Sequence, residues 1–226
     1  MAQNRRYKQH KICFLNPVFK HMHGKDKQIL AAYLPEKAVD IVSDWIKNKK
    51  IHLKIARNRK TKFGDYRPPI HHTNHRISVN YNLNPYAFLI TFVHEYAHLL
   101  VFEQHKKRVL PHGREWKNTY KTLMREVLDV GIFPEDLAQV LEKSIRNSKA
   151  SNVSDLDLSR VLHQYDAGET QQLRVEDLPD DTVFETQTGK QFQKGEKQRI
   201  RYKCRSLDNG QLYLFHPLTP VTLVEI

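Results

Sequence analysis

The pattern of apolar and polar residues predicts one long buried helix near the middle of the chain. Between residues 87 and 102, apolar side chains fall on nearly every face of a helix: Phe88, Leu89, Ile90, Phe92, Val93, Ala97, Leu99, Leu100, Val101 and Phe102. A helix that is apolar on all sides is a buried helix. Asn84 and Pro85 supply an N-cap and a proline for the first helical position, so we expect the helix to begin there.

The segments on either side of this helix predict further helices and two short strands. Apolar stripes at helical spacing predict helices over residues 35–49, 117–129 and 134–145. Alternating apolar and polar residues predict strands over residues 51–55 and 76–80, each with one buried face. One further short docking helix is predicted from Leu156, Leu158, Val161 and Leu162.

The last 45 residues change to alternating strand patterns. Thr188-Gly189 and Asp208-Asn209-Gly210 are typical of tight turns, and they predict a small antiparallel β module. The fold class that follows is α+β, with helices packed on a small sheet and a separate β module. The predicted segments are a basic N-terminal arm (1–24), the main domain (25–147), an acidic linker with the short helix (148–181) and the β module (182–226).

Composition places the chain among globular proteins of the reducing cytoplasm. Of its 226 residues, 39% are hydrophobic and 27% are charged. No apolar run approaches the length of a membrane span, and the N-terminus lacks the apolar region of a secretory signal. Its two cysteines, Cys13 and Cys204, build neither a disulfide framework nor a Cys-x-x-Cys metal site.

Positive charge is concentrated in the first half of the chain. The net charge is +12, and residues 1–126 carry 25 Lys and Arg against 9 Asp and Glu, which is +16. Residues 127–181 carry 5 against 12, which is −7. Such a surplus favours polyanions, and nucleic acid is the usual partner. The alternative is a solvated basic surface that binds nothing specific.

Within the buried helix lies the pattern His-Glu-x-x-His. His94 and His98 stand one helical turn apart on the same face, so both imidazoles can reach one metal ion. Glu95 lies beside them and can take a proton from the water that the metal activates. Buried polar groups need partners, and a metal supplies one. The alternative is a pair of core histidines that hydrogen-bond to the backbone.

A third histidine follows at the start of the next predicted helix. His112 precedes a helix that can fold back antiparallel to the first, which would bring its imidazole to the other two. Zinc in hydrolases takes three protein ligands and keeps a fourth position for water. We therefore predict one Zn²⁺ held by His94, His98 and His112, although His112 alone would more often be a loop residue.

Residues 57–69 are basic and contain a glycine and two aromatic residues. They are consistent with a nucleic-acid-binding loop, with cations on phosphates and Phe63 or Tyr66 stacked on bases. They are equally consistent with an edge strand that charge keeps soluble. The pattern does not decide between the two.

Two stretches together resemble a known family. Residues 94–98 (HEYAH) followed by residues 111–116 (PHGREW) are similar to the signatures of the SprT-like zinc metalloprotease family, the Spartan/SprT-like domain. The similarity extends upstream through residues 59–64 and 77–80, and so covers roughly residues 30–130.

The resemblance implies a zincin-like α+β domain with Glu95 as the catalytic base beside the three zinc ligands. It also implies an endopeptidase that cleaves proteins bound or crosslinked to DNA, in a DNA-stimulated way, with a role in stress response and DNA repair. DNA contacts would be non-sequence-specific, and no membrane is involved. Some bacterial members end in a zinc ribbon with four cysteines. Here the matching region offers only Cys204, so we expect a bacterial-type member without the second zinc.

Two other functions remain open. The main alternative is a nucleic-acid-binding protein with a structural zinc, which needs a fourth ligand that Cys13 or His75 would have to supply. The other is an inactive member that serves as an interaction scaffold, and the intact set of histidines and glutamate argues against it.

Overall fold

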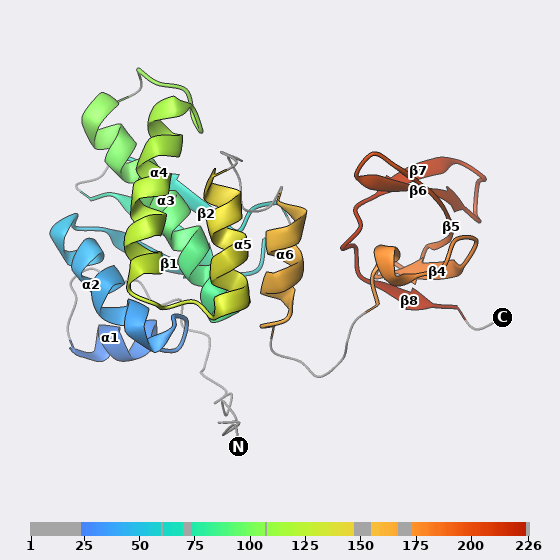
Figure 1. The fold of residues 1–226 in the computed structure, drawn as a ribbon, viewed down its shortest axis with the longest axis horizontal. Helices are drawn as coiled ribbons and strands as arrows, with labels where there is room; N and C mark the ends of the chain where they lie inside the picture. Colours follow the sequence, from blue (N-terminus) through green and yellow to red (C-terminus); the bar gives the residue numbers. More distant parts are fainter. Residues whose placement is uncertain are drawn as a thin grey trace. The chain divides into compact units, whose positions relative to one another are not determined.

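The computed structural model describes residues 24–59, 61–69, 74–106, 108–146, 155–166 and 173–224. The predicted basic arm lies outside these residues except for Gly24. The chain divides into two compact units, Met1–Asp166 and Ala167–Ile226 (Figure 1). The short predicted helix thus falls in the first unit, and residues 173–181 fall in the second.

The first unit combines helices with a three-stranded sheet. Its elements in chain order are α1 (Gly24–Leu30), η1 (Glu36–Ala38), α2 (Val39–Asn48), β1 (His52–Ala56), β2 (Gly64–Arg67), β3 (Arg76–Asn80), α3 (Pro85–His105), α4 (Arg114–Asp129), α5 (Glu135–Arg146) and α6 (Leu156–His163). The mixed α+β class predicted from the sequence is confirmed. The helix expected over residues 35–49 is a short 3-10 turn followed by α2.

Strand β3 is the centre of the sheet, whose order is β1-β3-β2. The pairing of β1 with β3 is parallel, and that of β2 with β3 is antiparallel. In the parallel pair, Leu53 lies beside Ile77 and Ile55 beside Val79, and all four side chains are buried. β2 occupies an edge of this sheet, so part of the basic stretch 57–69 forms an edge strand, one of the two alternatives. Nucleic-acid binding by the stretch stays a prediction.

Helix α3 contacts both the sheet and neighbouring helices. It packs against β2 and β3 on one side and against α4 on another (Figure 1). The side chain of Asn84 caps it by accepting a hydrogen bond from the backbone N–H of Ala87 at 2.9 Å, and Pro85 occupies the first turn, as predicted. Its buried residues lie on every face, because Trp45 of α2 also stacks on the Tyr96 ring at 4.7 Å.

The second unit is a five-stranded antiparallel sheet. Its elements are η2 (Val175–Asp177), β4 (Val183–Thr186), β5 (Gln191–Gln198), β6 (Arg201–Ser206), β7 (Leu212–Phe215) and β8 (Val221–Leu223). The strand order is β7-β6-β5-β4-β8. Gly189 and Gly210 have φ values of +76° and +70°, which confirms the two tight turns. Among the residues that the structure describes, no helix is both long and apolar enough to cross a membrane.

Candidate metal centre

His94 and His98 project from the one side of α3 that the core leaves partly open. Both are half-buried, whereas Val93, Tyr96 and Ala97 between and beside them are fully buried. Their rings lie 5.1 Å apart, centroid to centroid, as the spacing of one helical turn requires. The helix therefore holds the two imidazoles rigidly side by side.

His112 reaches the same point from a tight turn. The backbone N–H of Gly113 donates to the carbonyl oxygen of Leu110 at 3.0 Å, which closes a four-residue turn with Pro111 and His112 at its centre. His112 has a φ of +58°, and proline followed by a left-handed residue is the pattern of a type II turn. Glycine usually occupies that second position, so the histidine carries a backbone cost there.

The three imidazoles converge through their Nε2 atoms. The Nε2 atom of His112 lies 3.0 Å from that of His94 and 3.0 Å from that of His98. Three ligands on one tetrahedral zinc ion, at about 2.0–2.1 Å each, stand roughly 3.3 Å apart. The set thus has the size that such an ion needs, and in the described part of the chain no other cluster of three His, Cys, Asp or Glu residues could hold a metal.

Burial keeps these imidazoles neutral. It lowers the pKa of His94 to about 3 and that of His98 to about 4, and it also lowers the pKa of His112. A neutral Nε2 is either a donor or an acceptor, so His112 cannot supply a proton to both neighbours at once. A cation at the centre would satisfy all three lone pairs, and the donor set therefore fits a metal.

Trp116 forms the wall behind the three histidines. Its ring centroid lies 4.6 Å from that of His94, 5.3 Å from His98 and 4.7 Å from His112. The indole is 1% exposed, and Tyr120 stacks on it at 5.0 Å. The helical spacing predicted Trp116 as core, but it did not reveal this role. The packing fixes the orientation of all three rings and shields that side from water.

Glu95 lies on the adjacent face of α3, which is turned towards β2. Its side chain is buried, with the residue 8% exposed, and it accepts a hydrogen bond from the backbone N–H of Tyr66. Burial raises the pKa of Glu95 to about 7, and the nearby Asp65 carboxylate acts in the same direction. Arg59 and Lys62 oppose these two effects. A carboxyl group with a pKa near neutrality can both accept and release a proton.

A further feature of the site is the narrow space between β2 and α3, where the backbone of Gly64 lies directly against the Glu95 side chain.

 The space is kept open because residue 64 has no side chain: a Cβ atom there would stand 2.5 Å from Oε1 of Glu95 and 2.8 Å from Cγ2 of Thr91. Thr91 and Glu95 are one helical turn apart, so they present the same face of α3 to β2. In the sequence, Gly64 is distinguished only as the glycine of a basic stretch.

His75, one of the two proposed fourth ligands of a structural zinc, does not join the three histidines. His75 instead contacts the hydroxyl of Tyr66 through Nδ1 at 2.9 Å, and its Nε2 lies 3.7 Å from the carboxylate of Glu103. The metal-binding group found in the described residues contains His94, His98 and His112 alone. Cys13 lies outside the described residues.

Comparison with known proteins gives one match. The searches of curated proteins and of solved structures returned no match. The model of the SprT-like family matches residues 30–133. This range runs from the end of α1 to just beyond α4, so it contains the sheet, the three histidines, Glu95 and Gly64. The segment from residue 30 to residue 133 is therefore a SprT-like domain.

Proposed function

We propose that the protein is a zinc-dependent metalloendopeptidase with a zincin-like catalytic domain, and that it cleaves proteins bound or crosslinked to DNA. The observation that carries the proposal is the convergence of three neutral Nε2 atoms next to a buried carboxyl group on the same helix. Three protein ligands leave one position of a tetrahedral zinc open, as catalytic sites require.

His94, His98 and His112 would hold the zinc ion. When bound, the ion supplies Lewis-acid chemistry, polarising a peptide carbonyl and lowering the pKa of water. Glu95 accepts the proton of the attacking water and passes it to the leaving amine. Its pKa of about 7 suits both transfers at neutral pH. The wall formed by Trp116 excludes water behind the ligands and keeps their rings aimed at one point.

The edge of the sheet offers a means of holding the substrate. β2 pairs with β3 on one side only, and within the described residues no strand pairs with its other side. Backbone groups of an edge strand that have no partner within the protein can bind an extended peptide as an added strand. On β2 the N–H of Tyr66 is already bonded to Glu95. Because β2 contacts Glu95 through Gly64 and Tyr66, a peptide bound there would lie near the catalytic carboxyl group.

The DNA part of the proposal rests on charge and on the family resemblance. Residues 1–126, which include most of the SprT-like domain, carry the net charge of +16. Cations on such a surface bind phosphates without reading sequence. Some cations of the basic stretch are already engaged within the protein, since Lys62 and Arg67 both pair with Asp65. We therefore expect DNA binding to depend on salt and to use other lysines and arginines of this half.

The test is cleavage of a DNA-bound basic protein, with and without single-stranded DNA. Wild type is compared with Glu95→Gln and with the control Glu103→Gln, which changes a carboxylate on the same helix that is paired with Lys49. We expect Glu95→Gln to retain zinc and to lower turnover at least 100-fold, because a general base contributes about 10²–10⁴-fold. The Glu103→Gln variant should cleave the DNA-bound protein as wild type does. If wild type holds zinc and binds DNA without cutting, the alternative of a nucleic-acid-binding protein replaces the peptidase.

A further inference from the structure

The backbone of Gly64 lies so close to the Glu95 side chain that there is no room between them for a Cβ atom. Gly64 lies in the extended strand β2, and its φ is not in the left-handed region, so its backbone does not require glycine. What requires glycine is space. A Cβ at this position would meet Oε1 of Glu95 at 2.5 Å and Cγ at 2.7 Å. Approaches this short force one of the partners to move.

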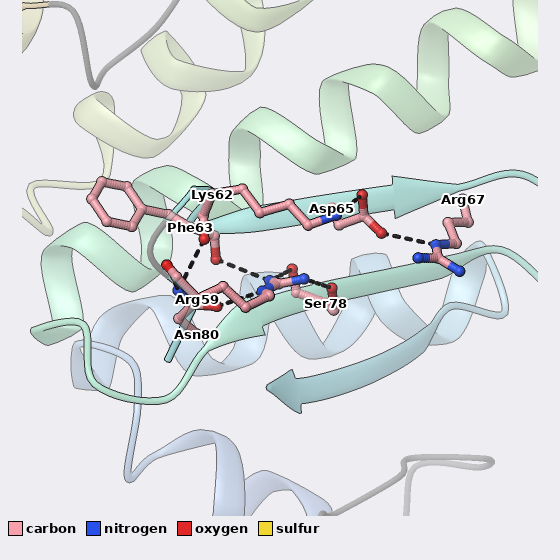
Figure 2. A network of polar contacts seen from close by, with 7 residues as sticks. All are labelled: Arg59, Lys62, Phe63, Asp65, Arg67, Ser78 and Asn80. Carbon is pink, nitrogen blue, oxygen red and sulfur yellow. Dashed lines mark hydrogen bonds and ion pairs between the residues drawn. The ribbon is translucent and has the colours of Figure 1, made fainter. Parts of the chain in front are cut away.

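The strand itself is not free to move away. Figure 2 shows a polar network that ties the residues just before β2 to β3. Arg59 donates through Nε to Oδ1 of Asn80 at 2.7 Å and through Nη1 to Oγ of Ser78 at 3.0 Å. Its Nη2 also donates to the carbonyl oxygen of Phe63 at 3.3 Å. The guanidinium group therefore joins the start of β2 to two residues of β3.

Asn80 completes this clamp from the inside. Its side chain is fully buried, and its Nδ2 donates to the carbonyl oxygens of Lys62 at 3.0 Å and Arg59 at 3.3 Å. Its backbone N–H donates to the carbonyl oxygen of Phe63 at 2.9 Å. Because these bonds are buried or shared among several groups, displacing the start of β2 would break many of them together. A side chain added at Gly64 would therefore displace Glu95.

We propose that Gly64 is a positioning residue, which gives the Glu95 carboxyl group its place beside the metal centre, and that the Arg59–Asn80 clamp holds the strand there. The proposal rests on the proposed function for its catalytic consequence only. The backbone N–H of Tyr66, two residues further along the same strand, fixes the carboxyl group by a hydrogen bond. β2 thus limits the space of the Glu95 side chain through Gly64 and orients it through Tyr66.

The test is Gly64→Ala, measured for zinc content, kcat and KM. We expect zinc content to be unchanged and KM to stay within about twofold, while kcat falls roughly 100-fold, because a displacement of about 1 Å costs that much. The added methyl group also approaches Thr91. The double variant Gly64→Ala/Thr91→Ser removes the Cγ2 atom of Thr91 and leaves Glu95 intact. We expect no recovery of kcat in it, and Thr91→Ser alone should behave as wild type.

A second measurement does not depend on peptidase activity. We expect Gly64→Ala to lower the Tm of the metal-free protein, and the same change in a Glu95→Ala background to lower it by less than half as much, because the displaced atoms are then absent. If Gly64→Ala fails to fold, the double variant Gly64→Ala/Glu95→Ala should fold. An equal loss of Tm with and without Glu95, or an unchanged kcat in Gly64→Ala, would overturn the proposal. If wild type does not cleave at all, the proposed function fails while the Tm comparison still decides the role of Gly64.

Discussion

Lys194 in the second unit and Glu95 in the first are both ionisable side chains buried in a core, and their surroundings differ. The ammonium group of Lys194 donates to the carbonyl oxygen of Leu178, lies 3.5 Å from the Asp180 carboxylate and stands 4.4 Å above the Tyr202 ring. The positive charge of Lys194 is therefore compensated by a carbonyl oxygen, a carboxylate and an aromatic ring. This network joins β5 to the segment before β4 and serves the fold.

Glu95 is compensated much less. The backbone N–H of Tyr66 and the cations Arg59 and Lys62 favour its charged form, but burial and the Asp65 carboxylate outweigh them and keep its pKa raised. Next to it, three imidazoles direct their lone pairs at one point and His112 sits in a left-handed conformation. Unbalanced buried groups and backbone strain of this kind gather where chemistry takes place. The Lys194 cluster therefore stabilises the fold, whereas the cluster around Glu95 has the properties expected of the proposed catalytic site.

The largest effect is expected from removing one of the three histidines of the proposed metal site. We expect His112→Ala and His112→Gly each to weaken zinc binding more than about 100-fold, the upper end of what loss of an outer-shell partner costs. In the metal-free state the glycine variant should be more stable than the alanine variant by about 1 kcal/mol, because glycine adopts positive φ freely. Zinc titration and thermal unfolding measure the two effects. Equal stability of the variants would contradict a strained turn.

The next effect concerns the pH dependence of the metal-free protein. The pKa of Glu95 is raised from 4.5 to about 7 on folding, so its stabilising contribution is complete below pH 4.5 and is lost as the pH rises through 7. Glutamine carries no such dependence. We therefore expect the stability of Glu95→Gln relative to wild type to rise between pH 5 and pH 8, by roughly 3 kcal/mol at most. A difference in unfolding free energy that does not change with pH would contradict a raised pKa of the buried Glu95 carboxyl group.

The smallest effect is expected from the structural cluster. Lys194→Met keeps the length of the side chain and removes its donor, which leaves the buried carbonyl oxygen of Leu178 without this partner. We expect the second unit to lose about 1–3 kcal/mol of unfolding free energy. Zinc binding by the first unit should not change. Loss of zinc in Lys194→Met would contradict the separation of the two clusters.

The sequence predicted the elements whose signals are local. The apolar run and the Asn84-Pro85 cap predicted α3, and alternation predicted β3 at its observed bounds. β2 remained undecided, because an edge strand of four residues, Gly64–Arg67, has too little buried surface to alternate. Nor did the segment after Pro35 show that a 3-10 turn would precede α2.

The candidate site was predicted to the extent that it follows from spacing. His94 and His98 are one turn apart on a helix, and His112 could be inferred from a helix that folds back. Pro111 before it was an additional signal, because proline favours the position that precedes a left-handed residue in a type II turn. Trp116 and Gly64 could not be predicted as parts of the site. Their roles depend on which helix face meets which strand, and this is decided by tertiary packing.

The most direct test of the metal centre is a crystal structure with anomalous diffraction measured at the zinc absorption edge. We predict a single peak in the SprT-like domain, about 2.0–2.1 Å from the Nε2 atoms of His94, His98 and His112. The Glu95 carboxyl group should lie beside Gly64 and outside the coordination sphere. A peak with Glu95 or a fourth protein side chain as a ligand, or the absence of a peak at the three histidines, would contradict a catalytic zinc site.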